Sequence, residues 1–341
     1  SWTASVTRED IARDLDARLS DEDDDSEVRM QAIGQFQRAS MFRIAVADFS
    51  GNLPIMKVSD GLTWLAEVVL AEALRVAWRD LASRHGVPRY SLDGVEHTAG
   101  FGIIAYGKLG GLELSYGSDL DIVFLHDSRG SRQSTDGDKP LDNGLFFGRL
   151  VRRLVHFLTM QTGSGQLYEI DTRLRPDGRS GLLVTSTEAF ERYQVDNAWT
   201  WEHQALLRAR PVAGSQAIAD DFARIRRETL VGRVRRDTLR DDVISMRQRM
   251  RKNLDRSDAQ LFDLKHGRGG IGDIEFLVQF LVLDNACEQP DVIFWSDNIR
   301  QLDALVAAGC IDKRDGDALQ DAYRAFRLRA HHPVSYTHLT L

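Results

Sequence analysis

Hydrophobic residues recur at helical spacing through the first quarter of the chain and predict two long helices. Between residues 28 and 48 they have the spacing of one buried helix face. A break at Gly51–Pro54 separates this segment from a second run with the same spacing. We expect Ser59 or Asp60 to cap the second helix and Gly86 to end it. Neither segment carries evident chemistry.

Short apolar runs in the middle of the chain predict strands. Residues 101–105 form one such run, and residues 119–125 form a second with two carboxylates at its entrance. Residues 143–162 have the pattern of an amphipathic helix, and residues 167–176 and 182–184 predict two more strands. The predicted fold class is therefore α+β, with a small mixed sheet backed by helices.

The connecting and C-terminal segments are mostly polar or helical. Residues 127–142 are polar and rich in glycine. We interpret them as a surface loop, the alternative being a loop that closes over substrate. Ser186 or Thr187 is expected to cap a helix. Further helical patterns predict a C-terminal bundle: residues 215–254, 298–308 and 313–330.

These patterns divide the chain into four parts. The chain begins with Ser1 rather than Met, so we expect it to be a piece of a longer protein. The predicted parts are a helical segment at 1–90, an α+β domain at 91–213, a helical bundle at 214–330 and a tail at 331–341 that breaks the pattern.

Composition excludes several classes of protein. The 341 residues are 43% hydrophobic and 28% charged, as in ordinary soluble globular proteins. The net charge of −7 argues against a general nucleic-acid-binding surface. Two cysteines exclude a disulfide framework and a cysteine-based zinc site. The sequence shows no long apolar run and no secretory signal, so we expect a cytoplasmic protein that does not span a membrane.

The strongest chemical signal is the pair Asp119 and Asp121. Alternate residues of a strand share one face, so both carboxylates point the same way while Leu120 and Ile122 point toward a core. Neighbouring carboxylates repel each other, and oxygen ligands on a strand suit Mg²⁺. The alternative is an exposed strand start with two solvated aspartates.

A third carboxylate, Asp171, lies on the predicted strand 167–176. If that strand is regular, Asp171 shares a face with Glu169, Arg173 and Arg175. Asp171 then completes a metal clamp, and the two arginines face a polyphosphate. The alternative is a half-exposed strand with paired charges. Two later residues, Arg208 and Arg210, either reach phosphate or lie on the surface.

A second glycine-rich stretch spans residues 262–276, with four glycines next to Lys265 and Arg268. Backbone N–H groups and cations of such a loop can surround an anion. The alternative is a plain loop that leads into a helix.

The spacing of the first glycine-rich turn and the aspartates resembles the nucleotidyltransferase superfamily related to DNA polymerase β. Seven residues separate Gly111 from Asp119, and an Asp-apolar-Asp-apolar run follows. The resemblance implies a polymerase-β-like domain whose turn holds the nucleotide's phosphates and whose strand with Asp119 and Asp121 holds the metal. The residues assigned to nucleotide binding are Gly107, Lys108, Gly110, Gly111, Gly117, Ser118, Arg173, Arg175 and Lys265.

Five longer stretches resemble the bacterial glutamine synthetase adenylyltransferase family: FQRASMFRIAVADFSGNLPIMKVSD, YGKLGGLELSYGSDLDIVFLHD, YEIDTRLRPDGRSGLL, AWTWEHQALLRARPVAG and FDLKHGRGGIGDIEFLVQFLVL. Members of this family carry two nucleotidyltransferase units. The sequence of residues 117–127 resembles that of the family's C-terminal unit. In the family, the C-terminal unit adds AMP to glutamine synthetase, and the N-terminal unit removes it by phosphorolysis. The chain departs from the family in having one unit, in Gly272, and in a tail at 334–341 that looks like a cloning or sequencing scar.

The resemblance implies ATP as substrate, Mg²⁺ as cofactor and a tyrosine hydroxyl of glutamine synthetase as acceptor. It also implies a PII signalling protein as a partner of the full-length chain, with no nucleic acid and no membrane involved. Two alternatives remain at this point: a non-catalytic regulatory fragment that binds nucleotide or a signalling protein, and a nucleotidyltransferase that acts on RNA or a small molecule.

Overall fold

The structure is a computed structural model that describes residues 6–19, 25–161, 165–258 and 260–331. The chain forms two compact units, which are described separately below. The first comprises residues 1–193 and 210–224, and the second comprises residues 194–209 and 225–341. The four-part division expected from the sequence stays a prediction, and its tail lies almost wholly outside the described residues.

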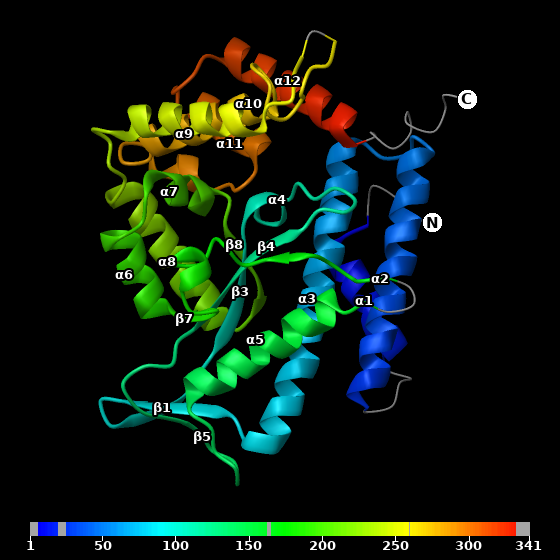
Figure 1. The fold of residues 1–341 in the computed structure, drawn as a ribbon, viewed down its shortest axis with the longest axis vertical. Helices are drawn as coiled ribbons and strands as arrows, with labels where there is room; N and C mark the ends of the chain where they lie inside the picture. The colour runs from blue at the N-terminus through cyan, green and yellow to red at the C-terminus, as the bar shows by residue number, and fades with distance from the viewer. Residues whose placement is uncertain (1–5, 20–24, 162–164, 259, 332–341) are drawn as a thin grey trace. The chain divides into compact units, whose positions relative to one another are not determined.

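Three helices open the first unit: α1 (Arg8–Leu19), α2 (Ser26–Phe49) and α3 (Ile55–His85) (Figure 1). The two long helices expected from the hydrophobic spacing are confirmed, and Gly86 ends α3 with a φ of 78°. The predicted cap is wrong, because α3 begins directly after Pro54. Pro54 is the N-cap residue: its backbone is extended at a ψ of 146°, and its carbonyl accepts the N–H groups of Lys57 and Val58.

A five-stranded mixed sheet forms the centre of the first unit. The strand order is β6-β4-β3-β8, and β7 also pairs with β4. The central strand β3 is antiparallel to β4 and β8, whereas β6 and β7 run parallel to β4. This mixed sheet confirms the predicted α+β class. The strands are β3 (Phe101–Ala105), β4 (Leu120–His126), β6 (Ile170–Asp171), β7 (Val184–Ser186) and β8 (Arg210–Gly214).

A second, three-stranded sheet has the order β2-β1-β5. It consists of β1 (Pro88–Leu92), β2 (Val95–Thr98) and β5 (Ser131–Thr135). The interpretation of residues 127–142 as a loop is therefore wrong in part, because β5 lies inside them. This strand has no apolar alternation, and it is held through pairing with β1 and through Asp136, which accepts hydrogen bonds from the Val87 N–H and the Arg89 side chain.

Helix α5 (Asn143–Thr159), labelled in Figure 1, supplies two phenylalanines to the aromatic core of the first unit. The ring of Phe147 stacks on Phe101 of β3 at 5.7 Å, and Phe146 meets Trp78 of α3 edge-on at 5.3 Å. The helix ends three residues before the expected Thr162. Asp142 caps its first turn by accepting the Leu145 N–H. These contacts pack α3 and α5 against each other and α5 against β3.

The second unit is helical, and its core lies between α10, α11 and α12. Val278, Val282 and Leu302 are fully buried, and the buried Tyr323 hydroxyl contacts Glu275 and Asn298. The helices predicted for 298–308 and 313–330 are confirmed. The helices of the second unit are α7 (Thr200–Leu207), α9 (Leu239–Leu254), α10 (Ile271–Asn285), η2 (Pro290–Ile293), α11 (Asn298–Ala307) and α12 (Lys313–His331). Two other helices, α6 (Thr187–Asp196) and α8 (Gln216–Gly232), each contain a boundary between the two units.

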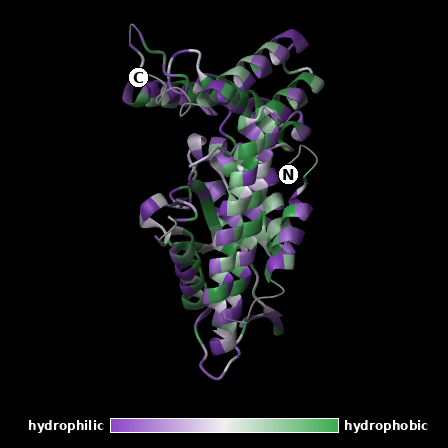
Figure 2. Cartoon of the chain, turned by 90° about the vertical axis from the view of Figure 1, so that its right-hand side faces the viewer, coloured by the Kyte–Doolittle hydropathy of each residue, from purple (hydrophilic) through white to green (hydrophobic). Residues whose placement is uncertain are grey.

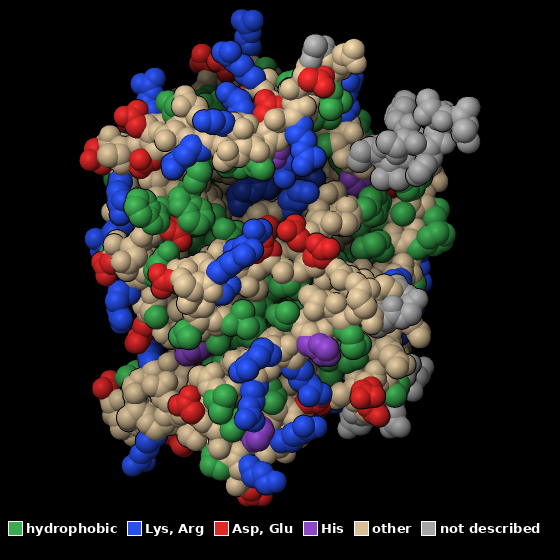
Figure 3. All heavy atoms as spheres, viewed as in Figure 1, with side chains coloured by type: hydrophobic (Ala, Val, Ile, Leu, Met, Phe, Trp, Pro, Cys, Tyr) green, Lys and Arg blue, Asp and Glu red, His purple; other side chains and the backbone are tan. Residues whose placement is uncertain are grey.

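Hydrophobic and hydrophilic residues are interleaved along the helices (Figure 2). Within the described ranges, no helix is both long enough and apolar enough to cross a membrane. On the face seen in Figure 3, acidic and basic side chains are interspersed.

Candidate active site

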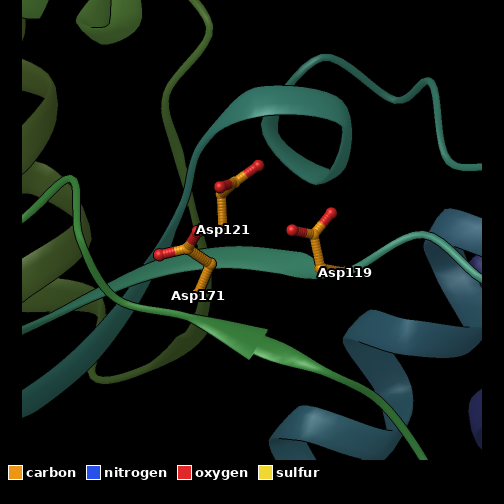
Figure 4. Close-up of side chains that lie close together, drawn as sticks. All are labelled: Asp119, Asp121 and Asp171. Carbon is orange, nitrogen blue, oxygen red and sulfur yellow. The ribbon is translucent and has the colours of Figure 1, made fainter.

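Asp119 and Asp121 lie at the start of β4, next to the short parallel strand β6. Leu120 and Ile122 are fully buried, so strand alternation directs the two aspartates away from the core. The Leu120 N–H donates to the Glu169 carbonyl at 2.8 Å, and the ladder places Asp121 opposite Asp171. Figure 4 shows the three aspartate side chains converging from the two strands.

The three carboxylates are close enough to share one cation. One oxygen from each of Asp119, Asp121 and Asp171 lies within 4.8 Å of the others. Asp119 is exposed, and the other two are half-buried. Three carboxylate oxygens that face one point are the donor set that a hard divalent cation such as Mg²⁺ prefers, with water and phosphate oxygens filling its other positions. The residues present therefore fit this metal.

The turn after β3 lies directly against one of these carboxylates. It forms the one-turn helix α4 (Gly107–Gly110), and Gly107 has a φ of 53°. A Cβ atom on Gly107 would lie 2.2 Å from Oδ2 of Asp121. The Tyr106 N–H also donates to the Asp121 carbonyl at 2.8 Å. Glycine at position 107 is thus required both by backbone conformation and by the close approach of Asp121.

The structure brings together Lys108 and Ser118, two of the residues assigned to nucleotide binding. The Lys108 ammonium group lies 3.2 Å from the Ser118 hydroxyl and 3.3 Å from the Ser115 hydroxyl. Gly111 caps α4, and Gly117 has a φ of 68° with open space where a side chain would start. The segment from 107 to 118 is therefore one compact loop that carries a lysine.

Asp171 is held by its own neighbour Arg173. The Arg173 Nε lies 2.9 and 2.6 Å from the two Asp171 carboxylate oxygens, and the Arg173 backbone N–H donates to Oδ1 at 2.8 Å. The side-chain hydrogen bond from Arg173 is the largest cause that lowers the pKa of Asp171. Only Ile170 and Asp171 of the predicted strand over 167–176 form a strand, and beyond Asp171 the hydrogen bonds from Arg173 turn the chain and end the alternation.

Arg175 does not share a strand face with Asp171, so the predicted charged ladder is wrong as well. Its guanidinium donates to the Thr172 carbonyl and hydroxyl at 2.8 and 2.9 Å and to the carbonyls of Arg179 and Gly181 at 3.2 and 3.3 Å. Arg175 therefore supports the loop that follows β6. A surface pocket of about 590 Å³ is lined by Asp119, Glu169, Ile170, Asp171, Thr172, Arg173, Arg175 and Arg179.

The amino-acid sequence of this chain is similar to those of two known protein families. The family profile described as glutamate-ammonia ligase adenylyltransferase matches residues 4–225, and that described as GlnD PII-uridylyltransferase matches residues 240–333. A bifunctional glutamine synthetase adenylyltransferase/adenylyl-removing enzyme of Thioalkalivibrio sulfidiphilus is 54% identical over 332 residues, which is 97% of this chain and 34% of that protein. The chain belongs to the glutamate-ammonia ligase adenylyltransferase family.

Other relatives of this adenylyltransferase family carry the same description. The protein of Nitrosococcus oceani is 49% identical over 316 residues, 92% of this chain and 32% of its own length. That of Pseudomonas aeruginosa is 48% identical over 336 residues, 94% of this chain and 34% of its own length. The chain thus spans about a third of the length of the curated relatives it matches.

The second glycine-rich stretch lies in the second unit. Its backbone N–H groups mostly donate within the stretch: Gly267 to the Asp263 carbonyl, Gly269 to the Asp273 carboxylate and Gly272 to the Lys265 carbonyl. This use of the N–H groups favours a structured lead-in to α10. The assignment of Lys265 to nucleotide binding stays a prediction.

Three residues at or beside the site were not assigned to it from the sequence. Arg179 lines the pocket, and it follows a glycine in a loop, where the pattern gives no signal of its direction. Arg210 and the buried Glu67 lie behind the glycine-rich turn, and 143 residues separate them in sequence. The sequence shows Glu67 among apolar residues of a helix, and it suggested Arg210 only as a phosphate contact or a surface residue.

Proposed function

We propose that this chain is a Mg²⁺-dependent adenylyltransferase that transfers AMP from ATP to a tyrosine hydroxyl of glutamine synthetase. The observation that carries the proposal is the convergence of Asp119, Asp121 and Asp171 against the turn at Gly107. The names of the similar proteins support glutamine synthetase as the target.

Asp119, Asp121 and Asp171 would hold the metal. When bound, Mg²⁺ supplies positive charge that aligns the phosphates and offsets the charge of the leaving group. The half-buried carboxylates contribute fixed negative charge, and the rigid ladder between β4 and β6 holds two of them in register. The protein thus supplies mainly positioning and electrostatic stabilisation.

The acceptor hydroxyl has an unperturbed pKa of about 10 and must lose its proton during attack. Its oxygen forms a bond to the α-phosphorus as the bond to the β-phosphate oxygen breaks and pyrophosphate leaves. We assign Asp171 to accept this proton, because Arg173 lowers the pKa of the carboxyl group and it is therefore ionised at neutral pH. Lys108 and Arg173 are assigned to the charge of pyrophosphate, while Arg175 keeps the loop in place.

The direction of the reaction rests on the resemblance of residues 117–127 to the unit that adds AMP. The test supplies the purified chain with Mg²⁺ under two conditions. One contains unmodified glutamine synthetase and α-labelled ATP, and the other contains adenylylated glutamine synthetase and phosphate. The proposal expects label on the synthetase in the first and no release of ADP in the second.

Two other outcomes contradict the proposal. Phosphorolysis alone would assign the chain to AMP removal, and binding of ATP without either reaction would favour a regulatory fragment. Regulation by glutamine or a PII protein is proposed for the full-length protein and is tested by adding each to it in the same assay.

A further inference from the structure

The turn that begins at Gly107 is supported from behind by the Arg210 side chain. Arg210 opens β8 and pairs with Ala105, the last residue of β3 before the turn. Its Nε donates to the Gly110 carbonyl at 2.9 Å, and its Nη2 donates to the Leu109 carbonyl at 3.0 Å. One guanidinium group therefore binds two consecutive carbonyls at the end of α4.

These carbonyls are the groups that the end of a helix leaves without an intrahelical partner. A cation at this position also satisfies the partial negative charge of the helix end. The opposite end of α4 is Gly107, which lies against the Asp121 carboxylate. A displacement at the end that Arg210 holds is therefore transmitted through a single helical turn to the proposed metal and phosphate site.

Arg210 is itself held by a buried carboxylate. Nη2 also pairs with Glu67 of α3, whose side chain is only 4% exposed. The other Glu67 oxygen accepts a hydrogen bond from Arg8 Nε of α1 at 2.8 Å. Two guanidinium groups thus compensate one buried charge, and removal of either would leave that charge poorly compensated. The network Arg8–Glu67–Arg210 ties the two helices to the turn.

We propose that Arg210 is a positioning residue for nucleotide binding, with Glu67 fixing its orientation. Lysine cannot replace it, because its ammonium group is a single point and cannot bind two carbonyls and a carboxylate in one plane. The inference rests on the proposed function in one respect, namely that the turn binds the nucleotide.

The test measures the Kd of Mg²⁺–ATP by calorimetry for the 341-residue chain, at a temperature well below its unfolding midpoint. The variants are Arg210→Lys and Glu67→Gln, and the matched control is Arg153→Lys. Arg153 also pairs with a carboxylate of α3, Asp80, but it contacts no residue of the turn. Thermal unfolding of each variant gives the loss of stability against which the change in Kd is compared.

We expect Arg210→Lys to raise the Kd by about tenfold, because the loss of a hydrogen bond to a charged group costs about as much free energy as a tenfold change in affinity. Glu67→Gln should raise the Kd in the same direction, and Arg153→Lys should leave it unchanged. With glutamine synthetase as acceptor, the KM for ATP should rise while the KM for the synthetase stays constant.

The inference is overturned if Arg210→Lys binds Mg²⁺–ATP like the wild-type chain, or if the Arg210 and Arg153 variants lose affinity equally for equal losses of stability. Failure of the wild-type chain to bind Mg²⁺–ATP would overturn the proposed function and this inference together. Binding by the wild type without transfer would overturn the proposed reaction alone.

Discussion

Substitution of Gly107 by alanine tests whether the turn and Asp121 form one unit. The change has two costs. The first is the left-handed backbone at a φ of 53°, which costs a residue with a Cβ about 1–2 kcal/mol. The second is the contact of 2.2 Å between the new Cβ and Oδ2 of Asp121. Ordinary contact of a Cβ begins at 3.4 Å, so the carboxylate or the turn must shift.

Gly94→Ala is the matched control. Gly94 lies in the turn between β1 and β2 with a φ of 80°, and a Cβ there meets nothing within 4 Å. The backbone cost is therefore shared by the two variants, and only Gly107→Ala also displaces a proposed metal ligand. A shift of about 1 Å in a catalytic group costs on the order of 100-fold in rate. Gly94→Ala should leave the rate unchanged.

The assay is transfer of label from α-labelled ATP to glutamine synthetase, with thermal unfolding measured alongside. We expect Gly107→Ala to lose about 100-fold in kcat while both variants lose a few degrees in Tm. The reasoning is refuted if Gly107→Ala turns over like Gly94→Ala, since Asp121 would then tolerate displacement or take no part.

Two further predictions concern stability. His126 accepts the Ser128 N–H at its Nδ1, and burial lowers the pKa of His126 to about 4 from an ordinary 6.5. The unfolded chain therefore binds the proton more readily than the folded chain does. The free energy of unfolding should fall by about 3 kcal/mol as the pH drops from above 6.5 to 4. Urea unfolding at several pH values should show a smaller fall for His126→Asn, and an equal fall would contradict the assignment. In the second unit, Asp273 accepts hydrogen bonds from Arg247 and Arg251. Asp273→Asn should lower the free energy of unfolding by about 2 kcal/mol. An unchanged urea midpoint would contradict a stabilising role for these hydrogen bonds.

The helices were largely predictable because each has its own hydrophobic periodicity. The spacing between residues 28 and 48 gave α2 within two residues at each end, and Gly86 ended α3 as expected. The start of α3 was missed because Ser59 and Asp60 looked like caps, while Pro54 had already begun the helix. Several residues near a helix end can favour its start or stop, and the sequence alone does not determine which of them sets the boundary.

The strands were harder to predict because their pairing is not local. Strand β5, with the sequence SRQST, has no apolar alternation, and it exists through its pairing with β1. Strand β6 is only two residues long, because Arg173 turns back onto Asp171. The positive charge of Arg173 was predictable from the sequence, but the direction of its side chain toward Asp171 was not.

The grouping of the three aspartates followed from chemistry rather than from pattern. A metal clamp needs carboxylates from more than one strand, and Asp171 was chosen because a neighbouring predicted strand could supply it. The register that places Asp121 opposite Asp171 is a property of the folded sheet. The Arg210–Glu67 pair had no comparable signal, since its two residues belong to a strand and a helix that are far apart in sequence.

The most direct test of the central claim compares two of the three clustered aspartates with a neighbouring carboxylate that lies outside the cluster. Adenylyl transfer to glutamine synthetase is measured across a Mg²⁺ titration for the wild type, Asp121→Asn, Asp171→Asn and Glu169→Gln. Glu169 lines the same pocket as Asp171 but lies outside the group of three, and its carbonyl, which binds the Leu120 N–H, is unaffected by the substitution. Both aspartate variants should fold and lose transfer at every Mg²⁺ concentration, while Glu169→Gln keeps it. Transfer at the wild-type rate by Asp121→Asn or Asp171→Asn would contradict the account.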